Sequence, residues 1–309
     1  MADVTIAIPT FRRPRGLERL LAALAKLETT ANVSVLVADN DAERREGVAV
    51  CERLRADGYR WTLDAIVVPE RGIAQSRNAL VVRILAGSGA EFVAMVDDDE
   101  WPQPQWLDAF LRAQRETDAD VLHGAILREF ERAPGIWAAH CPGIASTRVA
   151  RRASSTIPGA GNIFLRRACL EELAQPCFDP EFALTGGEDK DFFTRLKKQG
   201  RKFAGVDEAV CYEFVPASRA NLRWALQRAY RIGNSDMRVT LKHESATGAL
   251  ARESAKIAGA VLLFPLLFAI SIPFAARRAD PLCKLYRAAG KVAAIFGSHF
   301  NEYATVHGD

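Results

Sequence analysis

The segment FVAMVDDDEWPQPQW, residues 92–106, joins five apolar residues directly to four acidic ones. An apolar run of this length followed by polar residues is typical of a buried strand that ends at the surface. The acids at its end are Asp97, Asp98, Asp99 and Glu100. They repel one another, and a bound cation would relieve that repulsion. The alternative is an acidic turn in which Asp98 or Asp99 caps the helix that follows. The apolar run before the acids favours a binding site.

The sequence before this segment repeats the same arrangement. Three short apolar runs, VTIAI (4–8), VSVLVAD (33–39) and AIVV (65–68), are each followed by a stretch with helical spacing. After the first run, leucines recur at intervals of three and four residues: Leu17, Leu20, Leu21 and Leu24. Further helices are expected over 43–56, 73–85 and 105–117. This alternation predicts an α/β fold with a Rossmann-like, mostly parallel sheet flanked by helices.

Polar residues follow three of the predicted strands. Pro9 and Thr10 end the first, Asp39 ends the second, and the acids of 97–99 end the fourth. Ligands of parallel sheets bind outside the carboxyl ends of the strands. We therefore expect these residues to converge on one rim. After about Gly124 the alternation gives way to segments without a regular pattern.

Composition limits the possible functions. The chain has 309 residues, of which 26% are charged and 49% hydrophobic, so it can bury a substantial core. A net charge of +3 is too small to indicate nucleic acid binding, and no nucleic-acid motif is present. The six cysteines are scattered without a CxxC pair, which is typical of reduced thiols in the cytosol.

A second acidic motif lies in TGGEDKDFFTRLKKQG, residues 185–200. Glu188 and Asp189 follow two glycines at the expected start of a helix, and a carboxylate there can act as a general base on a hydroxyl group. The same acids could instead interact with the helix dipole, and Asp191 with Arg195 has ordinary i, i+4 spacing. Both interpretations remain open at this stage.

Arginines form two groups that could bind phosphate. The first lies in RGIAQSRNAL, where Arg71, Arg77 and Asn78 enter the predicted third helix. The second is in a helix expected over 221–232 and its approach: Arg219, Arg223, Arg228 and Arg231. Arginines on an amphipathic helix can equally form a solvated face or contact anionic lipid.

One stretch of the chain is long and apolar enough to enter a membrane. Residues 257–276 contain no charged residue and lie between Lys256 and Arg277. Pro265 and Pro273 would kink a spanning helix, and a basic segment with Lys284 follows. We expect a kinked or re-entrant anchor with both ends in the cytoplasm. A core helix or a dimer helix is the alternative.

Six motifs occur in an order that resembles the family 2 glycosyltransferases of the GT-A fold, which act in bacterial polysaccharide assembly. They are IAIPTFRRP, VLVADND, RGIAQSRNAL, FVAMVDDDEWP, GAGNIFLRR and GGEDKDFFTRLKKQG, within residues 4–215. The resemblance predicts three parts: a GT-A domain (1–215), an arginine-rich helical segment (216–250) and a membrane-associating C-terminal region (251–309).

The resemblance also implies roles for particular residues. Four would surround the base of a nucleotide, usually uracil: Pro9, Thr10, Asp39 and Arg77. Asp97 and Asp98 would contact the ribose or the donor sugar, while Asp99, with Asp97, would hold Mg²⁺ or Mn²⁺. Asp189 would be the catalytic base, with Glu188 positioning the acceptor; Asn162 and His123 would lie near the donor sugar.

The implied activity is the inverting, metal-dependent transfer of a sugar from a nucleotide-sugar donor, usually a UDP-sugar, to a glycan or lipid-linked acceptor. The resemblance and the apolar stretch at 257–276 together predict that the protein acts at the cytoplasmic face of the bacterial inner membrane, in contact with its lipid surface. The QxxRW motif of processive synthases is missing, because Arg223 and Trp224 precede Gln227, so we expect a single addition. Two alternatives are a nucleotidyltransferase acting on sugar phosphates and a catalytically silent membrane-associated binding protein.

Overall fold

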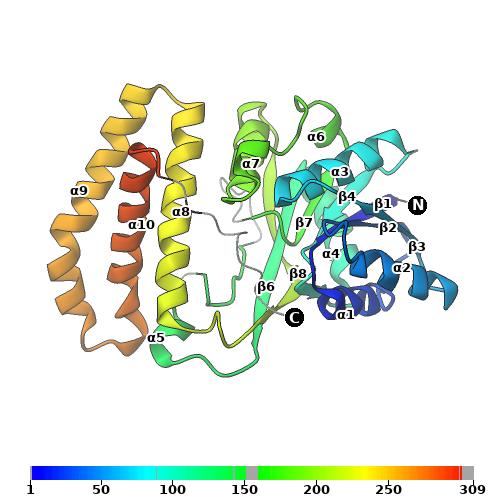
Figure 1. The fold of residues 1–309 in the computed structure, drawn as a ribbon, viewed down its shortest axis with the longest axis horizontal. Helices are drawn as coiled ribbons and strands as arrows, with labels where there is room; N and C mark the ends of the chain where they lie inside the picture. The colour runs from blue at the N-terminus through cyan, green and yellow to red at the C-terminus, as the bar shows by residue number, and fades with distance from the viewer. Residues whose placement is uncertain (1, 88, 142, 151–158, 299, 301–309) are drawn as a thin grey trace.

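The computed structural model describes residues 2–87, 89–141, 143–150, 159–298 and 300. Within them, an eight-stranded mixed sheet carries helices on both faces, and a layer of long helices stands beside it (Figure 1). The strands lie in the order β3-β2-β1-β4-β7-β6-β8-β5. The α/β prediction is therefore confirmed.

The N-terminal half of the sheet is parallel, as the alternation predicted. Its strands are β1 (Asp3–Thr10), β2 (Asn32–Asp39), β3 (Thr62–Val67) and β4 (Phe92–Met95). The helices between and after them are α1 (Pro14–Leu24), α2 (Glu46–Ala56), α3 (Ile73–Ala86) and α4 (Trp106–Thr117). The four leucines of α1 are completely buried against the sheet, because their spacing places them on one face of the helix.

The C-terminal half of the sheet mixes strand directions. It contains β5 (Glu100–Pro102), β6 (Val121–Phe130), β7 (Ile163–Arg166) and β8 (Phe203–Val215). β7 runs antiparallel to both β4 and β6, β5 runs antiparallel to β8, and β6 and β8 are parallel. Of these strands, β7 lies in a segment where the sequence showed no regular pattern, so the expectation of irregular structure was wrong there. β8 was not predicted from the sequence.

Two apolar layers enclose the sheet. One contains buried side chains of α1, α2 and α4, including Trp106 and Phe110, and the other contains those of α3, α6 (Ala168–Glu171) and α7 (Glu188–Lys198). Phe178 and Phe192 stack in the second layer, with ring centroids 4.6 Å apart. Two shorter elements are η1 (Pro180–Phe182), which contacts α3 and α7, and α5 (Ile136–Ala139), which packs near the helices that follow the sheet.

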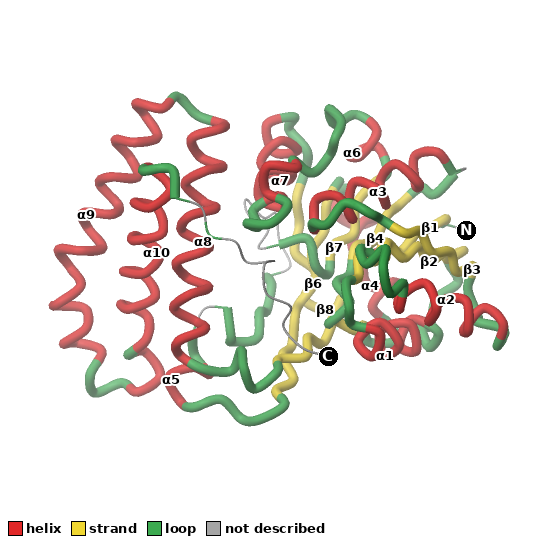
Figure 2. The backbone as a smooth tube through the Cα atoms, in the orientation of Figure 1, coloured by secondary structure: helices red, strands yellow, loops and turns green. Residues whose placement is uncertain are grey.

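Three long helices form the separate layer (Figure 2). They are α8 (Leu222–His243), α9 (Ala246–Ser271) and α10 (Ala279–Ile295), with η2 (Ala275–Arg277) before the last. α10 packs between α8 and α9. A Cβ at Gly290 would lie 1.9 Å from the carbonyl oxygen of Tyr230, so α10 approaches α8 closely enough to require glycine.

Two helix predictions were wrong in extent. α8 continues past the expected end at residue 232 to His243, and α9 begins before residue 257 and ends at Ser271. Pro265 lies inside α9, whereas Pro273 lies beyond its end. The proposed division into 1–215, 216–250 and 251–309 stays a prediction.

Candidate active site

A cavity of about 400 Å³ opens where β1 and β4 end, facing the first turns of α3 and α7. One side of α8 forms the wall opposite the sheet. Many of the residues singled out from the sequence line it, among them Pro9, Thr10, Arg77, Asp97, Asp98, Asp99, Glu188 and Asp189. The predicted convergence is therefore present for the ends of β1 and β4, but it does not include Asp39.

The acids after β4 are held by arginines and a hydroxyl group. Asp98 accepts hydrogen bonds from the Thr10 hydroxyl at 2.9 Å and from Arg13 Nη1 at 2.8 Å. Asp99 Oδ2 lies 2.9 Å from Arg13 Nη1 and 3.4 Å from Arg219 Nη1. These guanidinium groups relieve part of the repulsion between the acids, which the sequence analysis assigned to a bound cation.

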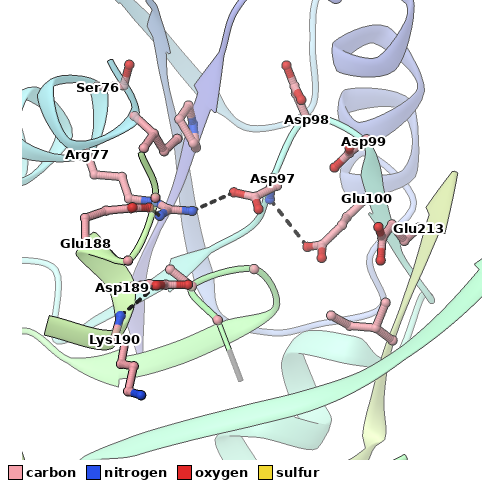
Figure 3. Close-up of a pocket in the computed structure, with 18 of the residues that line it drawn as sticks. Ser76, Arg77, Asp97, Asp98, Asp99, Glu100, Glu188, Asp189, Lys190 and Glu213 are labelled. Atoms are coloured by element: carbon pink, nitrogen blue, oxygen red, sulfur yellow. Dashed lines mark hydrogen bonds and ion pairs between the residues drawn. The ribbon is translucent and has the colours of Figure 1, made fainter. Parts of the chain in front are cut away.

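Arg77 joins the two acidic motifs (Figure 3). Its side chain is only 5% exposed; Nη2 lies 3.0 Å from Asp97 Oδ1, and Nη1 donates to Glu188 Oε1. One buried guanidinium thus holds a carboxylate from the end of β4 and another from the start of α7. The motifs that the sequence separates by some ninety residues share one wall of the cavity.

Burial changes the acidity of this wall. It raises the pKa of Glu188 to about 7, and the charge of Asp189 acts in the same direction. It also raises the pKa of Asp98 to about 6, partly offset by the charge of Arg13. Burial likewise raises the pKa values of Asp97 and Glu100, since a charged carboxylate is poorly solvated there.

The turn before α7 places Glu188 and Asp189. Gly186 and Gly187 have φ angles of 74° and 108°, which favour glycine, and a Cβ at Gly187 would lie 2.9 Å from the Cβ of Ser235. Asp189 is half-buried; its Oδ1 accepts from the Lys190 backbone N–H at 2.6 Å. Its Oδ2 faces the loop at Gly159, on the cavity wall.

Two predicted site residues lie outside the cavity. The Asp39 carboxylate accepts the backbone N–H groups of Asp41 and Val48, both at 3.0 Å, and fixes the start of α2. Asn162 is fully buried, accepts from the Trp106 indole at 2.7 Å, and donates to carbonyl groups of the β6 and β8 strands. Neither lines the cavity among the described residues. Both side chains instead hold backbone groups in place.

His123 does line the cavity. It is buried, and neither ring nitrogen has a hydrogen-bond partner among the described residues. Burial lowers its pKa, so the ring is neutral near pH 7.

The second arginine group divides between the cavity and the solvent. Arg219, Arg228 and Arg231 line the cavity, whereas Arg223 is exposed on another face of α8. The exposure of Arg223 fits a solvated face or a lipid contact, whereas phosphate binding stays a prediction for the three arginines that line the cavity.

Sequence reasoning missed several residues of the cavity. Arg13 lies in the short turn between β1 and α1, a position at the sheet rim that could have identified it. Glu100 was treated only as part of the acidic run, yet it is buried with its Oε2 3.4 Å from the Asp97 backbone nitrogen. Lys190 pairs with Asp236 of α8, which also lies 3.0 Å from Arg287 of α10. The last contacts are long-range, and no local signal indicates them.

The cavity offers carboxylate oxygens to a divalent cation. No group of three His, Cys, Asp or Glu side chains is arranged to hold a metal within the part of the chain that the structure describes. Mg²⁺ is commonly held by one or two carboxylates, with phosphate oxygens and water completing its shell. Asp99 and Asp97, both partly exposed to the cavity, fit such a substrate-completed site.

Comparisons with known proteins match this architecture. A family model described as Glycosyl transferase family 2 matches residues 5–173. The chain is 31% identical over 299 residues to the succinoglycan biosynthesis protein ExoM of Rhizobium meliloti (strain 1021), covering 95% of this chain and 93% of that protein. It is 26% identical over 251 residues to the chondroitin synthase of Pasteurella multocida (strain Pm70), covering 71% of this chain and 25% of that protein.

Two solved structures share the fold. The mannosyltransferase PcManGT from Pyrobaculum calidifontis, in complex with GDP-Man and Mn²⁺, has a TM-score of 0.64 at 16% identity, covering 95% of this chain and 87% of that one. Residues 1–349 of S. aureus TarS, in complex with UDP-GlcNAc, have a TM-score of 0.52 at 15% identity, covering 97% and 93%.

Proposed function

Because the chain belongs to glycosyl transferase family 2 and has a GT-A-like fold, we propose that it transfers one sugar from a nucleotide-sugar donor to an acceptor hydroxyl group, with inversion. The bridge from Asp97 through Arg77 to Glu188 carries this proposal. It supports a site in which the acids after β4 face the donor and those of α7 face the acceptor.

The donor diphosphate is proposed to lie against arginines of α8 and of the turn before it. Arg219, Arg228 and Arg231 line the cavity beside the acids that follow β4. A guanidinium group can bind a phosphate group through two parallel N–H···O hydrogen bonds. Pro9 and Thr10 would then contact the nucleoside, and we propose a UDP-sugar as the donor.

Asp189 is proposed as the catalytic base. Its Oδ2 would accept the proton of the acceptor hydroxyl group while that oxygen bonds to the anomeric carbon and the bond to the diphosphate oxygen breaks. Attack from the side opposite the leaving group inverts the anomeric centre. Glu188, which burial keeps partly protonated near neutral pH, would orient the acceptor from the same turn of α7.

A divalent cation would bind through Asp99 and Asp97, as either Mg²⁺ or Mn²⁺. When bound, it would neutralise charge on the leaving diphosphate. Arg13 and Arg219 already hold Asp99 in place, so its carboxylate would be oriented before the donor arrives.

The acceptor is proposed to be a growing exopolysaccharide, free or lipid-linked, at the cytoplasmic face of the bacterial inner membrane. The similarity to ExoM, named for succinoglycan biosynthesis, supports the first part. The membrane location rests on α9, the one helix among the described residues that is long and apolar enough to cross a bilayer. Only 6% of its apolar stretch is buried inside the protein.

The test is transfer by the purified full chain, supplied with nucleotide sugars and Mn²⁺ and followed as release of nucleoside diphosphate. General-base catalysis contributes about 10²- to 10⁴-fold, so Asp189→Ala should lose turnover by that factor while donor binding persists. Asp64→Ala, an exposed acid on β3, serves as the control. Wild-type turnover by Asp189→Ala would refute the assignment, and release of pyrophosphate from a nucleoside triphosphate would indicate a nucleotidyltransferase.

A further inference from the structure

A second hollow lies between α9 and α10. Figure 1 shows both helices on the side of α8 that faces away from the sheet. This α9–α10 groove has a volume of about 340 Å³. Its apolar lining includes Ile257, Leu263 and Leu267 from α9 and Ala288 from α10. A groove of this composition suits a hydrocarbon chain.

Four cationic side chains line the same groove: Lys256, Lys284, Arg287 and Lys291. Among the described residues, no acidic side chain lines it. Glu253 lies beside it and pairs with Lys256 at 2.7 Å and with Lys291 at 2.6 Å. Arg287 contacts Asp236, which also binds Lys190. Positive charge therefore remains in excess at the groove.

Lys284 is the cation best placed to receive an anion. It is exposed at the groove, and no ion pair holds it among the described residues. An apolar groove with this cation at its margin matches a molecule that has a phosphate group joined to a hydrocarbon chain.

The outer side of α9 is apolar and uncovered. Leu262, Leu266 and Ile270 are 77%, 58% and 57% exposed, and their spacing of four residues places them along one stripe of the helix. Figure 1 shows α9 at the outer edge of the helical layer. A continuous apolar stripe of this kind marks a contact with membrane or protein.

The packing of α10 fixes how deep α9 can enter a bilayer. Lys291 of α10 pairs with Glu253 of α9, so the two helices lie side by side, and α10 carries its cations along the apolar part of α9. Each lysine or arginine at the centre of a bilayer costs about 2.5–3.5 kcal/mol. The pair therefore fits the depth of the lipid headgroups better than the hydrocarbon centre.

We propose that the α9–α10 groove binds an anionic phospholipid of the bilayer, with the phosphate group at Lys284 and Lys256 and part of an acyl chain along Leu263. α9 then lies in the plane of the membrane with its outer stripe in the lipid. This inference rests on the membrane association proposed above, and it is independent of the sugar-transfer chemistry.

The experiment is sedimentation of the full chain with vesicles of phosphatidylcholine alone or mixed with phosphatidylglycerol. The protein should bind the mixed vesicles more tightly, and Lys284→Gln should weaken that binding about five-fold, as expected for one lysine near an anionic surface. Leu263→Ser should weaken binding to both kinds of vesicle. Lys26→Gln and Val82→Ser, at exposed positions of the sheet domain, are the matched controls and should bind as the wild type does.

Three results would overturn the inference: equal binding to both vesicles, wild-type binding by Lys284→Gln, or displacement of the protein by soluble glycerol 3-phosphate. The last would mean that a free phosphate compound occupies the groove. Transfer to a soluble acceptor is measured in parallel. Lost vesicle binding with intact transfer would reject only this inference, whereas intact binding without transfer would reject the proposed function.

Discussion

Arg77 is the single residue on which the acidic cavity depends most, because its guanidinium group faces carboxylates of both motifs. Removal of one partner from a buried ion pair typically costs about 3–5 kcal/mol, since the remaining charges lose their compensation. Arg77→Met should lower the free energy of unfolding by that amount in urea titrations. It should also abolish transfer.

Arg83 provides the control on the same helix. Its ion pair with Asp64 is half-exposed, and exposed pairs contribute about 0–1 kcal/mol. Arg83→Met should therefore leave both stability and transfer nearly unchanged. Equal losses in the two variants would show that Arg77 acts only through helix α3 as a whole.

Glu188 makes stability depend on pH. Its pKa rises from an ordinary 4.5 to about 7 in the folded chain, through burial and the charge of Asp189, which outweigh Arg77 and Arg231. The folded state holds an extra proton between these values, so the free energy of unfolding should fall as pH rises from about 4.5 to about 7. The shift corresponds to on the order of 3 kcal/mol.

Glu188→Gln tests this dependence because the amide keeps the shape of the carboxyl group but cannot ionise. Urea titrations at pH 5 and pH 7 should show a smaller loss of stability in the variant than in the wild type. Asp98 and other acids still titrate in both proteins, so the difference between them isolates Glu188. An unchanged pH dependence would contradict the raised pKa.

At the scale of elements, α7 is held against α8 by a completely buried carboxylate. Asp191 lies 3.0 Å from Arg195 Nε, 2.7 Å from Lys242 Nζ and 2.8 Å from His243 Nε2. Asp191→Asn should lower the free energy of unfolding by about 3 kcal/mol and reduce turnover, because α7 carries Asp189. Asp118→Asn, at an exposed surface pair, is the control; equal losses would remove Asp191 from this role.

The elements were predicted unequally because some bury a face fixed by their own sequence, whereas others depend on contacts with distant parts of the chain. The leucine spacing of α1 was sufficient, because that helix buries a face fixed by its own sequence. β7 has four residues, and its pairing with β4 and β6 makes it a strand. The sequence of α8 beyond residue 232 is small and polar, GNSD, yet it is buried against α10 and α7. Contacts this distant leave no local pattern.

For the whole molecule, motif order located the cavity but not every side chain in it. The acids at strand ends were predicted because sheet topology gathers those ends. Asp39 also lies at a strand end, but its carboxylate binds backbone N–H groups before and within the first turn of α2. The spacing of residues in the sequence does not predict which hydrogen-bond partners a carboxylate takes. The cavity wall formed by α8 depends on how the helical layer packs beside the sheet, and no sequence motif predicts that packing.

Since the cavity is formed jointly by the sheet and the helical layer, a donor that fills it should stabilise both together. A ligand at a hundred times its dissociation constant adds about 2.7 kcal/mol to the free energy of unfolding. UDP with Mn²⁺ should therefore raise the midpoint of thermal unfolding in one transition, and EDTA should remove most of that rise. Asp99→Asn should lose the part that depends on metal, whereas Asp64→Asn should keep it. A rise of the same size with EDTA present would show that the nucleotide binds without a cation and that Asp99 serves only to hold Arg13 and Arg219.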